Sequence, residues 1–432
     1  MEYRPSRSFI ILMSVFTACG VAGAWGWNRM NSVPQDVRAK ADLWKILTYK
    51  RPSVFEPPTP AEVARVKGEV DKMKAELVAT HPLLAINART VPADRNAFLR
   101  LHLLTGPGEL PHKTVSRELA TAMDKDNKAT WDAARMRTLL EGHQELIAEL
   151  RLIGGLPERS SNGMPDDYTG FVSGREIANQ AKVLLHSAKL AALDGNPGQA
   201  LNDVKCVTAM ASHYQEVGGT NLLMTTIAIL LDGFVREWVL EEMLPILGPD
   251  TDLQPWREIL ATRRYDPQLL ARALRGEWHY LTGSFVLPVL LLERPDNPRD
   301  PEELMNFIAD QFSESVDFAS KADLADLTNL PEITPAESSH LSKKSRELVK
   351  TFTTGWASWG NGFVRAAVRQ QMGLAAMDLI ILERSGSVPT TTEVMKDLPK
   401  NPLDGVPFHY DPATRTLSLS EKDSSESLRL PR

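Results

Sequence analysis

The sequence predicts a mainly α-helical protein: a multi-helix body of antiparallel helical hairpins, an N-terminal transmembrane helix, and a small C-terminal helix with a β-hairpin. Two observations support the helical body. Apolar residues recur at steps of three and four through most of the chain between residues 60 and 384, which places them on one helix face. Alternation with period two, the pattern of a half-buried strand, is almost absent before residue 400.

The first thirty residues, 1–30, predict a membrane anchor or signal segment. Arg4 and Arg7 precede an uncharged stretch from Ser8 to Trp27, and twenty residues at helical rise cover a bilayer core of about 30 Å. Positive charge before the stretch places its start in the cytoplasm, so the bulk of the chain is expected outside the inner membrane of a bacterial cell. The residues expected in the membrane or at its interface are Phe9, Ile10, Ile11, Leu12, Val15, Phe16, Trp25 and Trp27.

Two other fates of this segment stay open. Ala22-Gly23-Ala24 fits the small-x-small pattern of a signal peptidase site, and Cys19 follows a small residue as in a lipoprotein box. All three fates export the chain. The second cysteine, Cys206, is then expected to be a buried thiol, and two cysteines exclude a disulfide framework.

The expected body follows a proline-rich stalk at 31–58 and occupies residues 59–326. Thr59-Pro60-Ala61-Glu62 supplies a cap, a first-turn proline and an early acid, so a helix is predicted from there to about Thr80. Further helices are predicted at Asp94 to Leu104, Thr114 to Met123, Lys128 to Ile153, Gly174 to Leu193, Pro197 to Gln215, Thr220 to Ile246, Leu253 to Thr262, Pro267 to Leu281 and Pro301 to Phe312.

The clearest helix pair is joined by Asp194-Gly195-Asn196-Pro197, a glycine turn followed by a proline that restarts the helix. The junction looks like the inside of a tetratricopeptide repeat, but the repeat period is not found elsewhere, so one hairpin is predicted. The apolar run from Leu222 to Leu231 is too short to span a bilayer and predicts the central core helix.

A linker is predicted at 327–345, followed by a C-terminal unit at 346–420. This unit contains a long helix ending near Glu383 and a hairpin around Pro407 to Leu419, in which Leu417 and Leu419 share one side. The last residues, 421–432, are polar enough to predict a disordered tail.

The C-terminal residues resemble a known group of proteins. A helix, then Ser387-Val388-Pro389, then the stretch from Leu398 to Tyr410 is similar to the end of uncharacterised exported helical proteins of planctomycete-type bacteria. The hairpin from Leu185 to Tyr214 and the stretch Arg275-Gly276-Glu277 resemble the middle of that group. This resemblance implies architecture and an exported location, and no activity.

The same hairpin is similar to the end of the major pseudopilin of type II secretion, whose C-terminal loops can hold calcium. Asn401 stands where that pattern has its leading aspartate, and Leu403 where it has tryptophan. The N-terminal segment also lacks the glutamate that pilins have just inside their processed end. The resemblance therefore implies a strand pair that closes onto the preceding helix.

Composition and motifs exclude several functions. Among 432 residues the formal net charge is −6, so the chain offers no basic excess for nucleic acid. Phosphate-binding loops, a nucleophile elbow and a zinc-protease motif do not occur, and the nine histidines lack ligand spacing. No cofactor and no metal site is predicted.

The sharpest catalytic hypothesis concerns Glu277 in the stretch RGEWHY, with His279 and Arg275 beside it. A buried Glu277 with a raised pKa would act as a general acid, and Asp232 or Asp266 would be its ionised partner. The competing interpretation is structural, an ion pair between Glu277 and an arginine, and it is preferred because buried acids usually have such a partner.

These observations favour a non-enzymatic, membrane-tethered scaffold outside the cytoplasm that binds other envelope proteins and no nucleic acid. The alternatives are an envelope glycan or peptide hydrolase that uses Glu277, with Asp232 as a weaker candidate, and a component associated with a secretion or pilus apparatus.

Overall fold

The computed structural model describes residues 60–431, apart from 88, 106–113, 125–130, 163–173, 263–264, 284–299, 332–337, 339–340, 343–344, 347–348, 350–355, 387–393 and 420–425. The predicted anchor, its eight membrane residues and the stalk lie outside the described residues. Among the helices that are described, none combines the length and apolarity needed to cross a bilayer.

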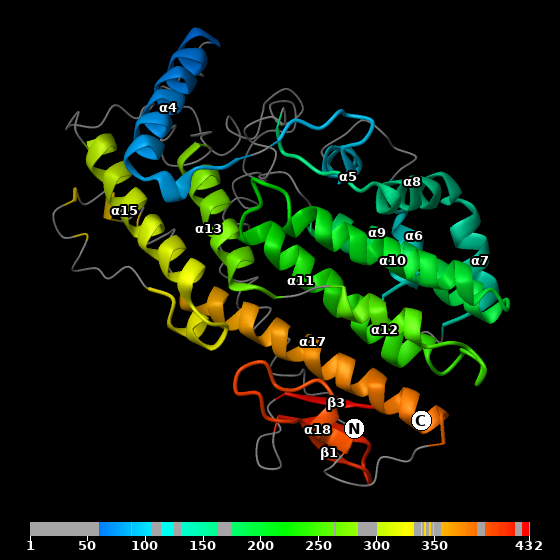
Figure 1. Ribbon diagram of the computed structural model, residues 1–432. Coiled ribbons are helices and arrows are strands. Elements are labelled where there is room, and N and C mark those ends of the chain that lie inside the picture. Colours follow the sequence, from blue (N-terminus) through cyan, green and yellow to red (C-terminus); the bar gives the residue numbers. More distant parts are fainter. Residues whose placement is uncertain are drawn as a thin grey trace.

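The described chain is mainly α-helical, as predicted (Figure 1). Its helices pack around two buried apolar clusters. The first cluster is formed by α5 (Ala97–Thr105), α6 (Arg117–Ala122), α7 (Ala133–Glu141), α8 (Gln144–Gly155), α9 (Gly174–Leu193), α10 (Pro197–Gln215), α11 (Leu222–Glu237), the π-helical turn η4 (Trp238–Met243) and α12 (Gln254–Ala261). The second is formed by α4 (Pro60–Thr80), the turn η1 (Pro82–Leu84), α13 (Pro267–Leu281), α15 (Asp300–Lys321) and the turn η6 (Ala325–Asn329).

The hairpin of α9 and α10 has the predicted bounds because its turn chemistry is local. Gly195 has φ of 75°, which glycine adopts without strain. The Asn196 side chain accepts a hydrogen bond from the Gln199 amide, and Pro197 begins the next helix. The hairpin is fastened to α8 by Arg151, whose guanidinium donates to both oxygens of the fully buried Asp203 at 2.7 and 2.8 Å.

Three predicted helices differ from the structure by more than three residues or are divided. The helix expected over Lys128 to Ile153 is two helices, α7 and α8, which meet at Gly142 and His143. The helix expected over Thr220 to Ile246 ends as α11 at Glu237 and continues as the π-helical turn. The last helix of the body, α15, runs on to Lys321 because its apolar face continues through Val316 and Ala319.

The long helix α17 (Trp356–Arg384), drawn in Figure 1, contributes residues to both clusters. Phe363 and Val364, near its start, belong to the second cluster, and the stretch from Val368 to Ile380 belongs to the first. The linker expected at 327–345 begins inside this packing, since Leu327 and Leu330 are buried. α17 therefore connects the two clusters.

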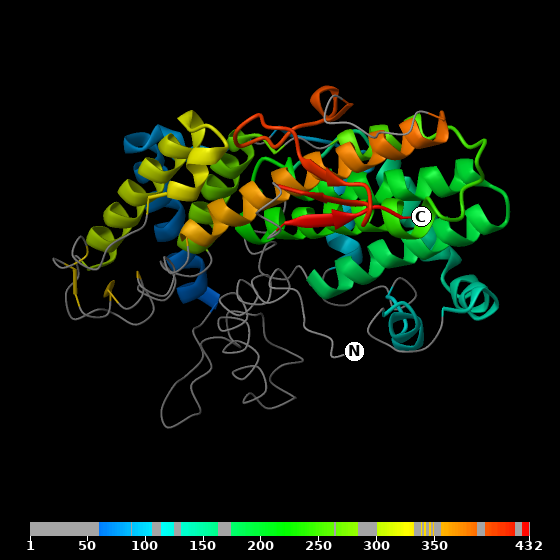
Figure 2. The same cartoon turned by 90° about the horizontal axis from the view of Figure 1, so that it is seen from below.

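The C-terminal element is a three-stranded antiparallel sheet, one strand more than the predicted hairpin. Its strands are β1 (His409–Asp411), β2 (Thr416–Ser418) and β3 (Ser427–Arg429), in that order, and it lies against α17 (Figure 2). The prediction of a disordered tail is wrong for β3, because Leu430 beyond it is buried in the first cluster. Glu426 also accepts hydrogen bonds from Arg369 of α17 at 2.7 and 3.1 Å.

Candidate functional site

The stretch RGEWHY lies on α13, and its polar side chains bind backbone groups of neighbouring segments. Arg275 Nε donates to the Leu83 carbonyl oxygen at 2.7 Å, and His279 Nε2 forms a hydrogen bond of 2.8 Å with the Leu84 carbonyl oxygen. Both bonds hold the turn η1 against α13. Burial lowers the pKa of His279 to about 4, with a smaller effect from Lys74, so the ring is neutral at pH 7.

Glu277 binds the start of α11. The Leu222 amide donates to Glu277 Oε2 at 3.0 Å, and Leu222 is the first residue of that helix, where amides have no partner within the helix. Burial raises the pKa of Glu277 to about 7, and the bond from Leu222 opposes this effect. Within the described part of the chain no arginine pairs with Glu277, so the helix amide takes the place of the expected ion pair.

Gly276 explains why α13 can lie so close to the turn before α11. A Cβ added at Gly276 would lie 1.8 Å from the Thr220 carbonyl oxygen, far inside any tolerated contact. The glycine and the two hydrogen bonds of Arg275 and His279 make this stretch a structural junction between α13, η1 and the α11 turn.

The two carboxylates expected to partner Glu277 are far from it. Asp266 caps its own helix by accepting from the Gln268 amide at 2.8 Å, and eleven residues of helix separate it from Glu277, about 16 Å. Asp232 lies ten residues along α11 from Leu222, about 15 Å. Paired catalytic carboxylates of glycosidases lie about 5–9.5 Å apart, so the fold does not assemble the expected acid and partner.

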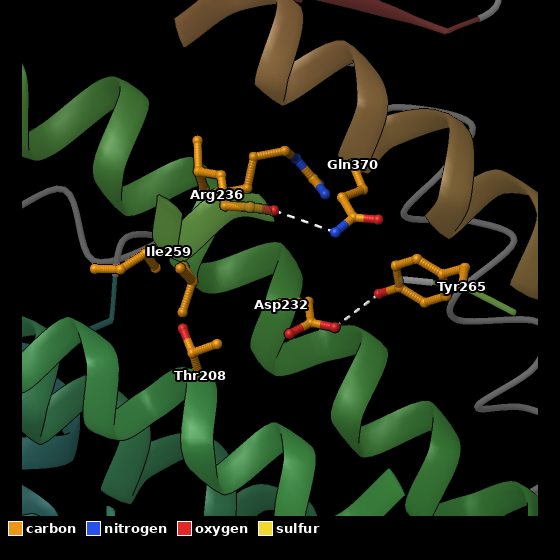
Figure 3. A pocket seen from close by; sticks show the side chains of 8 residues that line it. Thr208, Asp232, Arg236, Ile259, Tyr265 and Gln370 are labelled. Carbon is orange, nitrogen blue, oxygen red and sulfur yellow. Dashed lines mark hydrogen bonds between the residues drawn. The ribbon is translucent and has the colours of Figure 1, made fainter. Parts of the chain in front are cut away.

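Asp232 instead lines a small cavity where α10, α11, α12 and α17 meet (Figure 3). The cavity measures about 20 Å³, which is enough for one water molecule or another group of that size. Its lining residues are Thr208, Asp232, Val235, Arg236, Ile259, Leu260, Tyr265 and Gln370.

Two hydrogen bonds hold the walls of this cavity. Tyr265 Oη donates to Asp232 Oδ2 at 2.8 Å, and Gln370 Nε2 donates to the Leu260 carbonyl oxygen at 3.1 Å, both drawn in Figure 3. The Tyr265 ring also packs edge-on against Phe363 of α17 with centroids 5.3 Å apart. The polar groups of the cavity therefore come from four helices and one connection, held at fixed positions.

Arg236 is the feature of this cavity that sequence analysis missed. It follows Asp232 by four residues, and these two positions share a face of a helix. Burial lowers the pKa of Arg236, and the positive charge of Arg369 adds to this effect. The pair Asp232-x-x-x-Arg236, at the end of an otherwise apolar helix, was the sequence pattern that could have indicated this polar cluster. No such pattern surrounds Tyr265 or Gln370 in the sequence.

The turn that resembles the pseudopilin end uses its oxygens within the backbone. Asn401 Oδ1 accepts from the Leu403 amide at 3.2 Å, and Asp404 Oδ1 accepts from the Val406 amide at 2.9 Å. Over the part of the chain that the structure covers, no group of three or more His, Cys, Asp or Glu side chains could hold a metal ion.

Comparison with known proteins adds no relative: no family model, curated protein or solved structure matches this chain.

Proposed function

We propose that this protein is a non-catalytic scaffold of the bacterial cell envelope, tethered by its N-terminal helix, that binds other envelope proteins through the surface of its helical body. One observation carries the proposal. The acid, base and cation of RGEWHY, the most reactive-looking stretch of the chain, all bind backbone atoms of neighbouring segments. Side chains that bind backbone atoms in this way stabilise the fold. Binding of a partner protein is then expected at the surface of the helical body.

The tether rests on the sequence. Residues 8–27 are uncharged and long enough for a bilayer, and the arginines before them favour a cytoplasmic start. The described body from residue 60 would then lie outside the inner membrane.

The surface formed by α5 and α8 is the region where we expect partner proteins to bind. Leu103 on α5 is 60% exposed and Leu152 on α8 is 49% exposed, and the two helices are linked by the pair of Arg100 and Glu149 at 3.1 Å. Exposed apolar side chains that form a patch with a polar rim mark protein contact surfaces, so these two leucines are the positions to test.

The test is made in cells that produce the full-length chain. A photocrosslinking amino acid replaces Leu103 or Leu152, and the same change at exposed Glu141 on α7 is the matched control. We expect the protein in the membrane fraction, digestion of its body by protease added to spheroplasts, and discrete adducts with envelope proteins from the two leucine positions. A soluble, protease-protected protein, or adducts equal to those from position 141, would contradict the proposal.

A further inference from the structure

The side chain of His186 on α9 accepts a hydrogen bond that fixes its protonation state. Trp131 Nε1 donates to His186 Nδ1 at 3.0 Å. An indole N–H can only donate, so His186 Nδ1 presents a lone pair and the proton of the neutral ring lies on Nε2. His186 is buried, with 4% of its surface exposed. The bond to Trp131 therefore exists only while the imidazole is neutral.

Two tryptophans enclose this imidazole. Trp131 is stacked against His186 with an interplanar angle of 13° and centroids 6.3 Å apart, and Trp238 of η4 meets the ring edge-on with centroids 4.8 Å apart. Trp238 is buried and Trp131 is half-buried. Lys189 Nζ lies 4.1 Å from the centroid of the Trp131 ring. The indoles remove water from the imidazole, and this desolvation favours its neutral form.

The charged side chains that face His186 also oppose its protonation. Lys182 precedes it by four residues and Lys189 follows it by three, so both lie on its face of α9. Glu242 of η4 is already paired, since it accepts from Lys189 Nζ at 2.7 Å. Burial and the charges of Lys189 and Lys182 lower the pKa of His186 to about 3, against smaller opposing effects of the Met123 backbone and Glu242.

The bond ties the start of α7 to α9, and the rest of α7 is attached independently. Trp131 lies two residues before the first residue of α7. Farther along this helix, Met136 and Leu140 are buried, and Arg137 pairs with Asp194 at the turn between α9 and α10. Loss of the Trp131 bond therefore frees one end of α7 and leaves the other end in place.

We propose that Trp131 and His186 form an acid-released latch, in which a proton that binds His186 Nδ1 takes the lone pair that holds Trp131 and frees the start of α7. In the opened latch the imidazolium is hydrated, and the indole of Trp131 is exposed to solvent beside the ring of Trp238. The pair of Arg151 and Asp203, which fastens α10 to α8, does not involve His186. The hairpin of α9 and α10 is therefore expected to stay packed when the latch opens.

The pH at which the latch opens follows from linkage. The pKa of His186 is about 3 in the closed latch, against an ordinary value of 6.5. The opened form binds the proton more tightly, so acid favours opening progressively as pH falls from 6.5 to about 3 and adds nothing outside that window.

The experiment is ¹⁹F NMR of the full-length protein labelled with 5-fluorotryptophan and acidified stepwise from pH 8. The variants W131F and W256F assign two resonances, and Trp256, buried in α12, is the internal control. We expect the Trp131 resonance to move toward that of the free amino acid with a midpoint between about pH 4 and 6. The Trp256 resonance and the far-UV circular dichroism should not change over that range.

The variant H186Q keeps a side-chain oxygen that can accept from Trp131 and does not ionise. The matched control is H213Q, which removes another buried histidine, bonded to the Ile153 carbonyl oxygen. Acid should leave the Trp131 resonance in place in H186Q and move it in H213Q as in the wild type.

Because H186Q can also fail to fold, ¹⁵N NMR of the His186 imidazole in the wild type supplies an independent measure. Nδ1 should be unprotonated at pH 8 and become protonated at the pH where the Trp131 resonance moves. A proton on Nδ1 at pH 8, an equal acid response in H186Q, or movement of Trp131 only together with Trp256 would overturn the proposal.

Discussion

Replacing Glu277 by Gln should change how stability depends on pH, and in the direction opposite to that of most carboxylates. The pKa of Glu277 is about 7 in the folded chain against 4.5 in the unfolded chain. A difference of about 2.5 pKa units corresponds to about 3 kcal/mol. Below pH 4.5 Glu277 is protonated in both the folded and the unfolded chain, so its burial does not reduce the free energy of unfolding through ionisation. As pH rises from 4.5 to 7, the unfolded state releases its proton first, so wild-type stability falls.

E277Q keeps an oxygen that accepts from the Leu222 amide and does not ionise. The free energy of unfolding of E277Q minus that of the wild type should therefore be about 3 kcal/mol larger at pH 8 than at pH 4. The assay is urea unfolding of both full-length proteins at a series of pH values, with E141Q on the exposed end of α7 as the control for losing one negative charge. A wild-type advantage that grows with pH would refute the reasoning, since it would mean that the folded state stabilises the charged form of Glu277.

Three further changes test the packing. G276A should destabilise the protein by at least about 3 kcal/mol, because its Cβ would meet the Thr220 carbonyl. Gly68 lies on the exposed face of α4 with nothing within 4 Å of an added Cβ, so G68A should stabilise the protein by about 0.5–1 kcal/mol. Thermal unfolding measures both changes. D203N should cost about 3–5 kcal/mol in urea unfolding, because it leaves the Arg151 guanidinium without its carboxylate, and equal stability would contradict the role of this pair. L430A should cost about 2–3 kcal/mol, and L403A, at a residue 37% exposed, less than about 1; an unchanged midpoint for L430A would mean that β3 is not anchored.

Local signals in the sequence predicted the elements whose ends they determine. The α9 and α10 hairpin and α13 have the expected bounds because Asn196-Pro197 and Asp266-Pro267 cap their helices within a few residues. The break between α7 and α8 lacks such a signal before Gly142. β3 was missed because the charges around Ser427–Arg429 obscured the alternation of Leu428 and Leu430, and its pairing depends on β2 and α17.

The cavity could not be predicted because its parts are distant in the sequence. Thr208, Arg236 and Gln370 lie on three helices, and only the packing of α17 across α11 brings Gln370 to Arg236. Conversely, the grouping of Glu277 with Asp266 overestimated what proximity in the sequence implies, since the eleven residues of helix between them correspond to about 16 Å.

The central claim is that this chain acts through its surface while Glu277 supports the fold. It is tested most directly by photocrosslinking from position 103 in cells that carry either wild-type Glu277 or E277Q. The account predicts the same envelope-protein adducts, in equal yield, in both. A bound glycan or peptide that accumulates only on the E277Q protein, as on a hydrolase that has lost its acid, would contradict it.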